Sequence, residues 1–236
     1  MRQVLTVAGR EARSLAASSV AHVTAAVVLA VFGLFFTSDL SGLTQARLDG
    51  WFESSAVLLL VLAPVLAMRS LAEERRSGSI DVLLAGPVSD ATLVVGKFLG
   101  LLGVYVAILV ATLPAVVLVG AWGDPDPGPL LTGYGGLLLL GAASLAVALL
   151  ASALSPHQAV AAVTGFVLLL VLWLLAGLSD AFAGSVSHVL LELGTTTHLE
   201  PFYRGLVPLD GVVYFASVVV VALAGAVGVL ESRRWR

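Results

Sequence analysis

The sequence predicts an all-α, polytopic membrane protein, and three observations support this prediction. The chain has 236 residues, of which 59% are hydrophobic and 11% charged, with a mean hydropathy of +1.04. Soluble domains carry roughly 25% charged residues, so the composition argues against a single soluble domain. Several apolar runs of about 20 residues are each long enough to cross a hydrocarbon core about 30 Å thick. The alternating segments of about ten residues that mark a membrane β-barrel do not occur in the sequence.

The first expected element is a short amphipathic helix over residues 1–14. Four apolar residues recur about one turn apart and three arginines fall elsewhere: Val4, Ala8, Ala12 and Leu15; Arg2, Arg10 and Arg13. This pattern is typical of a helix at a membrane surface. The alternative is the basic start of a signal peptide, but the apolar stretch 15–36 is longer than a signal peptide requires. We therefore expect an uncleaved first transmembrane helix at 15–36.

Five further transmembrane helices are expected. Their approximate bounds are 54–71, 92–122, 130–154, 158–178 and 210–230. Pro64 is expected to kink the second span, because proline lacks the backbone N–H that a helix uses there. The third span contains Pro114, and the proline-rich turn 124–129 ends it. Ser155-Pro156-His157 makes a tight turn between the fourth and fifth spans. The prediction is six spans in a single domain, 1–236.

The basic residues predict how these spans are oriented. With a cytoplasmic N-terminus, ten of the twelve basic residues face the cytoplasm: Arg2, Arg10, Arg13, Arg69, Arg75, Arg76, Lys97, Arg233, Arg234 and Arg236. Only Arg47 and Arg204 then lie outside, which is the distribution that the positive-inside rule selects. Both termini are therefore expected in the cytoplasm, with the chain crossing a cell membrane several times. The outward-facing segments are 38–53, 123–129 and 179–209.

The segment 72–91 is the most charged part of the chain and interrupts two apolar runs. Its ion cluster is Glu73-Glu74-Arg75-Arg76, and Ser77-Gly78 then breaks the helix. Residues 79–85 form a short segment with an apolar side and with Asp81 in its first turn, where a carboxylate complements the helix dipole. Gly86-Pro87 ends this segment, and Ser89 or Asp90 can cap the next helix. An ordinary charged loop is the alternative, but a capped apolar face favours a docking element.

Catalytic motifs are missing from the sequence. The one Gly-Lys pair, Gly96-Lys97, lacks the first glycine of a P-loop and the Ser or Thr that follows it. A metal site could be built from four outer residues, although solvated side chains are the simpler interpretation: His188, Glu192, His198 and Glu200. We therefore expect no catalytic residue, no metal and no bound cofactor in this chain, and no nucleic-acid partner. Gly96 and Gly100 form a small-x-x-x-small pattern that could let two helices approach, or could be chance.

The span interiors argue against an ion-coupled carrier or channel. Apart from His22 and Lys97, near the starts of their spans, no ionisable residue lies well inside the apolar runs. Ion-coupled transport needs such groups, and each costs about 2.5–3.5 kcal/mol at the helix centre. The last three spans carry only mildly polar groups: Ser144, Ser152, Thr164, Trp173, Tyr214 and Ser217. If these helices move a substrate, the energy must come from a partner.

The segment between the second and third spans resembles that of the permease subunits of type 2 ABC transporters. Their pattern is similar to ERxxGTxExLLxxPV, with Gly-Lys a few residues later. Here residues 74–88 read ERRSGSIDVLLAGPV and Gly96-Lys97 follow, with Ser79 in place of Thr and Asp81 in place of Glu. The six-span layout extends the resemblance over essentially the whole chain. The outer segment 198–210 is also similar to the gliding-motility and copper-enzyme-maturation branch of that family.

The resemblance implies a half-transporter without its own catalytic site. Two permease subunits, identical or related, would form the export pathway, and each would bind a cytoplasmic ATPase that holds the ATP and Mg²⁺. Residues 1–14 would be the connecting helix, 72–91 the coupling element and 179–209 an external segment with short re-entrant helices. The residues implied to contact the ATPase or to shape the coupling helix are Glu73, Glu74, Arg75, Arg76, Gly78, Asp81 and Pro87. The alternative function is a membrane anchor or assembly module of an envelope complex.

Overall fold

The structure is a computed structural model, and the residues that it describes are 2–18, 22–23, 25–27, 29–31, 33–34, 49–76, 89–114, 116–117 and 126–234. Within these residues the secondary structure is entirely helical, which confirms the all-α prediction. The helices are α1 (Arg2–Ala16), α3 (Asp49–Ala67), α4 (Ala72–Arg76), α6 (Asp90–Ala111), α8 (Pro127–Leu154), α9 (Gln158–Leu178), the short 3-10 helix η1 (Ser179–Ala181), α10 (Ser185–Leu193), α11 (Thr195–Tyr203) and α12 (Leu209–Arg234).

Five segments of the described chain are long and apolar enough to cross a membrane. They are Gly50–Arg76, Asp90–Ala111, Pro127–Leu154, Gln158–Ala181 and Leu209–Ser232. The first expected span, 15–36, falls largely outside the described residues, so the count of six stays a prediction. The multi-pass membrane architecture itself is confirmed.

Several helix bounds differ from the sequence prediction, and each difference has a local cause. Helix α3 begins at Asp49 rather than 54, since Trp51 and Phe52 are buried and extend the packed face into the expected loop. The helix also continues through Pro64, and the kink expected there stays a prediction. Helix α6 ends at Ala111, residues 113–114 and 116–117 are again helical, and the expected end of this span near 122 lies outside the described residues. The Thr112 hydroxyl donates to the Leu109 carbonyl at 2.6 Å and so satisfies one of the free acceptors of the helix end.

The start of α8 shows how a proline-rich turn can also begin a helix. We expected residues 124–129 only to stop the preceding span, but α8 starts at Pro127. The carboxylate of Asp126 accepts a hydrogen bond from the Gly128 N–H at 2.9 Å, and proline fits the first helical positions because no N–H is needed there. The fifth predicted span, 158–178, coincides with α9.

Helix α8 is the centre of the bundle. It packs against α3, α6, α9, α11 and α12, and a long series of its residues is buried. Small residues permit the close contacts: a Cβ on Gly141 would lie 2.1 Å from the Tyr105 ring of α6. The Tyr105 hydroxyl donates to the Leu137 carbonyl at 2.7 Å, so its polar group is satisfied inside the apolar core.

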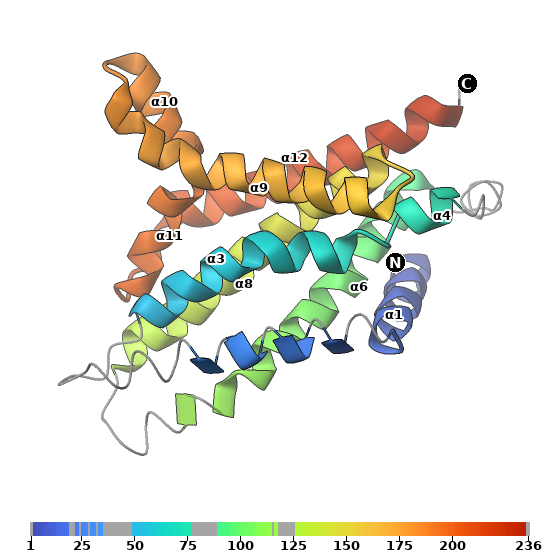
Figure 1. The fold of residues 1–236 in the computed structure, drawn as a ribbon, viewed down its shortest axis with the longest axis horizontal. Helices are drawn as coiled ribbons and strands as arrows, with labels where there is room; N and C mark the ends of the chain where they lie inside the picture. The colour runs from blue at the N-terminus through green and yellow to red at the C-terminus, as the bar shows by residue number, and fades with distance from the viewer. Residues whose placement is uncertain are drawn as a thin grey trace.

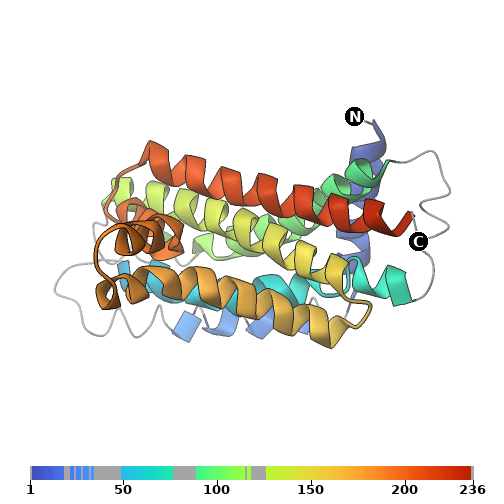
Figure 2. The ribbon, with the colours of Figure 1, turned by 90° about the horizontal axis from the view of Figure 1, so that it is seen from above.

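The long helices run side by side and the short ones lie at their ends. Figure 1 shows α10 and α11 at one end, and α1, α4 and both chain termini at the other. In Figure 2, α1 runs crosswise to the long helices. Helix α1 packs closely on α6, where a Cβ on Gly96 would lie 2.7 Å from Val7 and one on Gly100 would lie 2.9 Å from the Ala8 carbonyl oxygen. The small-x-x-x-small pattern therefore serves the contact with the N-terminal helix.

A matched pair of glycine substitutions tests this contact. Gly100→Ala is expected to lower the free energy of unfolding by about 1–3 kcal/mol, because the added methyl group overpacks against α1. The higher helix propensity of alanine offsets up to about 1 kcal/mol of this loss. A Cβ on Gly103 meets nothing within 4 Å, so Gly103→Ala gains propensity without a clash. Denaturation of the purified protein in detergent, followed by circular dichroism, measures both. Equal effects of the two substitutions would show that α1 does not pack on this face.

Candidate functional site

The ion cluster Glu73-Glu74-Arg75-Arg76 of the predicted docking element lies in α4, which begins directly after a turn at the end of α3. Glu73 and Glu74 lie in its first turn and Arg75 and Arg76 in its last. This order places negative charge at the positive end of the helix dipole and positive charge at the negative end. The helix is short, so its stability must come from the contacts that it makes with the rest of the bundle.

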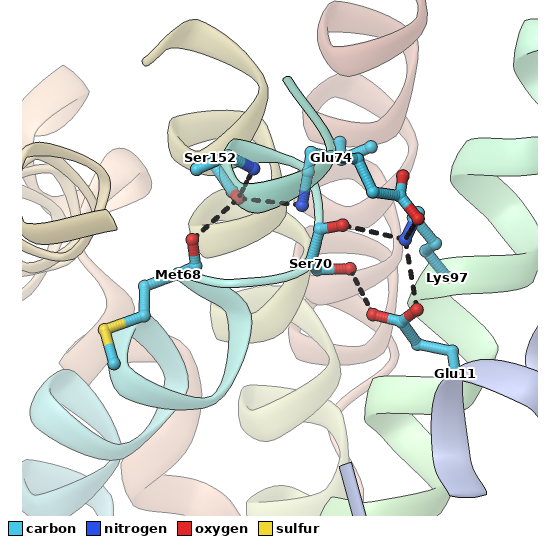
Figure 3. A network of polar contacts seen from close by, with 8 residues as sticks. Glu11, Met68, Ser70, Glu74, Lys97 and Ser152 are labelled. Carbon is cyan, nitrogen blue, oxygen red and sulfur yellow. Dashed lines mark hydrogen bonds and ion pairs between the residues drawn. The ribbon is translucent and has the colours of Figure 1, made fainter. Parts of the chain in front are cut away.

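Lys97 of α6 occupies the centre of a charged cluster beside α4, here called the Lys97 cluster: Glu11, Ser70, Glu74 and Lys97. The Lys97 ammonium lies 3.0 Å from a carboxylate oxygen of Glu11 in α1 and 2.8 Å from one of Glu74 in α4 (Figure 3). It also donates to the Ser70 carbonyl at 2.7 Å. The second oxygen of Glu11 accepts a hydrogen bond from the Ser70 hydroxyl at 2.6 Å. Three helices and one turn therefore meet at a single side chain.

The burial of Lys97 makes this arrangement obligatory. Its side chain is 2% exposed, whereas those of Glu11 and Glu74 are 14% and 23% exposed. A buried ammonium without partners costs several kcal/mol, and its three N–H groups each need an acceptor. The cluster supplies three acceptors, two of them charged. Any movement of α4 away from α6 would remove one acceptor from a cation that water does not reach.

Ser152 of α8 satisfies the backbone where α3 ends and α4 begins. Its hydroxyl oxygen accepts hydrogen bonds from the N–H groups of Leu71 and Ala72, both at 3.1 Å, and it donates to the Met68 carbonyl at 3.3 Å (Figure 3). Helix ends leave such backbone groups without intrahelical partners. One fully buried hydroxyl thus replaces a local cap and ties the turn to the central helix.

Two arginines extend these ties to further helices. Arg75 of α4 donates from its guanidinium to the Ala153 carbonyl near the end of α8. Arg69, in the turn before α4, lies 3.4 Å from the side-chain oxygen of Gln158 at the start of α9 and 3.3 Å from the hydroxyl of Ser18. Helix α4 and its turn are therefore connected to α1, α6, α8 and α9. The connection consists mainly of charged or polar side chains. Their contacts require specific distances and directions, which apolar packing does not.

The sequence-predicted docking residues do not share one environment. Glu74 and Arg75 point into the contacts just described, whereas Glu73 and Arg76 are exposed. Gly78, Asp81 and Pro87 lie outside the described residues, as does the short helix expected at 79–85. The expected cap of the next helix is confirmed, because the Ser89 hydroxyl accepts from the Thr92 N–H at 3.2 Å.

Glu11, Ser70 and Ser152 are the members of the site that sequence reasoning did not assign a role. Glu11 is the single acid in the arginine-rich helix α1, and Lys97 is the single lysine in the chain. An unpaired opposite charge in each of two elements could have suggested their pairing. Nothing in the sequence indicates the contacts of Ser70 and Ser152, since a serine in an apolar helix is compatible with many environments.

At the opposite end of the bundle, polar and aromatic groups position α11. Its His198 stacks on Tyr214 of α12 at a ring distance of 4.2 Å and contacts the Glu192 carbonyl at 3.0 Å. The Tyr203 hydroxyl lies 3.3 Å from the Phe52 carbonyl oxygen of α3. Burial, with smaller effects of Glu53 and Tyr105, raises the pKa of Tyr203, so this hydroxyl stays neutral.

The four outer residues of the metal-site alternative are all described, and they do not converge. His198 approaches the backbone of Glu192 rather than its carboxylate. In the described part of the chain, no group of three or more His, Asp or Glu side chains is placed to hold a metal ion. Glu200 instead pairs with Arg204 on the surface. The geometry gives this end of the molecule a packing role.

Removal of the central cation tests the energetic role of the Lys97 cluster. Lys97→Met is expected to lower the free energy of unfolding by about 3 kcal/mol, because it leaves two partly buried carboxylates without their cation. The combined variant Lys97→Met, Glu11→Gln, Glu74→Gln should recover part of this loss, since it removes the repelling charges. The exposed Glu73→Gln is the control, with an expected change within about 0.5 kcal/mol. Chemical denaturation in detergent measures all three, and a full loss in the combined variant would contradict charge pairing as the cause.

Comparison with known proteins identifies the family of this chain. The comparison with curated proteins gives no match. A family model described as ABC-2 family transporter protein matches residues 6–220, which cover most of the chain and include α4, α6, most of α1 and the Lys97 cluster. The chain therefore belongs to the ABC-2 transporter family and is a membrane permease subunit of an ABC transporter.

Proposed function

We propose that this chain is the permease subunit of an ATP-driven exporter and that α4, with the Lys97 cluster, receives the motion of a cytoplasmic ATPase. The observation that carries the proposal is the position of α4. Helix α4 and the turn before it connect by charged and polar contacts to four helices, and Glu73 and Arg76 remain exposed. An element that moves with a partner needs both an outward docking face and an inward connection.

The distribution of charge supports a cytoplasmic location for this end of the molecule. The described basic side chains at this end include Arg10, Arg13, Arg69, Arg75 and Lys97, whereas Arg204 lies beyond α11 at the other end. The positive-inside rule favours the cytoplasm for the end with the excess. Both termini would then be cytoplasmic in the inner or plasma membrane. The likeness of residues 198–210 to the gliding-motility and copper-enzyme-maturation branch supports membership of that branch and an export direction.

The packing of a single copy supports a pathway formed between two copies. The cavity between α3, α8, α9, α11 and α12 has a volume of about 10 Å³, which is about the space that one water needs. A larger pocket of about 520 Å³ lies beside α6 and α8, opens to the surface and is lined almost entirely by apolar side chains. In the most apolar 18-residue stretch of α8, 72% of the residues are buried, whereas the corresponding share is 17% in α9 and in α12. The outward faces of α9 and α12 would therefore meet lipid or a second permease subunit, identical or related. ATP and Mg²⁺ would bind to the ATPase and not to this chain.

Charge reversal on the exposed side of α4 tests the proposed docking. The double variant Glu73→Arg, Arg76→Glu is expected to weaken binding to the proposed partner ATPase at least about tenfold, because it places like charges across the contact. Stability of the isolated permease should change little, since both side chains are exposed. The affinity is measured by titration of purified ATPase onto the permease in nanodiscs.

The matched control reverses the surface pair at the other end, Glu200→Arg with Arg204→Glu, and should bind the ATPase normally. Glu74 and Arg75 make a poorer test, because their reversal would also disrupt contacts with Lys97 and Ala153. Normal ATPase binding and normal transport by the Glu73, Arg76 variant would overturn the docking role of α4.

A further inference from the structure

Helix α1 has a second surface that the contact with α6 leaves open. Its packed side includes Val7, Glu11 and Leu15. On the opposite side Arg10 and Arg13 are exposed and lie three residues apart, so they share one face of the helix. Leu5 is 67% exposed and lies beside this face. The exposed surface of α1 therefore combines basic side chains with an apolar one.

Glu11 of α1 belongs to the Lys97 cluster and does not neutralise this surface. Glu11 is the single acidic residue of α1, and both of its carboxylate oxygens are engaged, one by Lys97 and the other by Ser70. Among the described residues, no acidic side chain forms an ion pair with Arg10 or Arg13. The helix has three arginines and one glutamate, and with this glutamate turned inward the exposed charges of Arg10 and Arg13 are positive.

The position of α1 brings this surface to the membrane boundary. Helices α3 and α8 end at Ala67 and Leu154, and both ends lie beside the Lys97 cluster through the contacts of Ser70 and Ser152. The ends of these apolar helices mark the edge of the hydrocarbon region. Helix α1 packs at the same level and runs crosswise to the long helices (Figure 2). A crosswise helix with basic and apolar side chains at this level is typical of interfacial binding.

We propose that the exposed surface of α1, centred on Arg10 and Arg13, binds the headgroups of anionic phospholipids. The charge of the surface is complementary to anionic headgroups, and Leu5 would reach the acyl boundary beside them. The packed side of the same helix carries Glu11, which belongs to the Lys97 cluster. Bound anionic lipid would therefore stabilise the docked position of α1, on which one of the acceptors of Lys97 depends.

The proposal rests on the cytoplasmic placement of α1 but not on the ATPase, and its test uses the permease alone. The chain has no cysteine, so Ala17→Cys, at an exposed position directly after α1, gives a single attachment point for a bimane label. The labelled full chain is placed in nanodiscs that contain brominated phosphatidylglycerol or brominated phosphatidylcholine. The ratio of bimane quenching by the brominated phosphatidylglycerol to quenching by the brominated phosphatidylcholine reports which lipid is enriched at α1.

We expect phosphatidylglycerol to be favoured by a factor of up to about five for each of the two arginines. Arg10→Gln with Arg13→Gln should bring the ratio close to one, while the two lysine substitutions Arg10→Lys and Arg13→Lys should retain most of it. Arg204→Gln, at the other end of the chain, should leave it unchanged. Higher salt should lower the preference, because it screens exposed charges.

A ratio of one in the unsubstituted chain would overturn the proposal, as would an undiminished preference in the glutamine variant. A preference that the lysine variants also lose would overturn the electrostatic explanation. Failure of the ATPase titration with α4 variants would leave this result unaffected, so the two proposals fail separately. The melting temperature of the glutamine variant, compared with that of Gly100→Ala, shows whether α1 remains docked.

Discussion

A lysine ammonium that water does not reach needs an acceptor for each of its N–H groups, and one end of this protein is arranged around that requirement. Lys97 receives its acceptors from α1, from α4 and from the turn between α3 and α4. None of these elements could shift without leaving the cation short of a partner, at a cost of several kcal/mol. An apolar contact at the same place would tolerate sliding, since dispersion and burial depend weakly on direction. The cluster therefore fixes the relative position of three elements.

The two ends of the bundle use different physical means. At the end that holds α4, this helix and its turn are joined to the bundle by Glu74, Arg75, Arg69 and the hydroxyl of Ser152. At the other end, α11 is held by aromatic packing, such as the stacked rings of Phe52 and Tyr203 at a ring distance of 5.6 Å. Directional polar contacts fix the relative position of two elements, whereas apolar packing tolerates more sliding. This difference supports the proposal that the end with α4 receives motion from a partner.

Under the two proposals, helix α1 links the permease to the membrane surface as well as to α4. Glu11 faces inward and the arginines face outward, so one helix separates its charges between two partners. The glycines of α6 make this possible, because only a close approach of α1 brings Glu11 within reach of Lys97. Lipid composition and ATPase docking would then act on the same cluster from opposite sides, and each would influence the other through Glu11 and Glu74.

The sequence by itself determined the all-α membrane fold, the position of α9 and the location of the charged element, because composition, apolar run length and proline placement act locally. It also indicated the Gly96 and Gly100 contact, though not that α1 would be the partner. The sequence did not predict where α3 begins or where α6 ends, since these bounds depend on the burial of Trp51 and on the capping hydroxyl of Thr112. Only the tertiary structure decided the Lys97 cluster: Glu11 and Lys97 are 86 residues apart. Which acid reaches a buried cation depends on how the helices cross, and no local pattern in the sequence records that crossing.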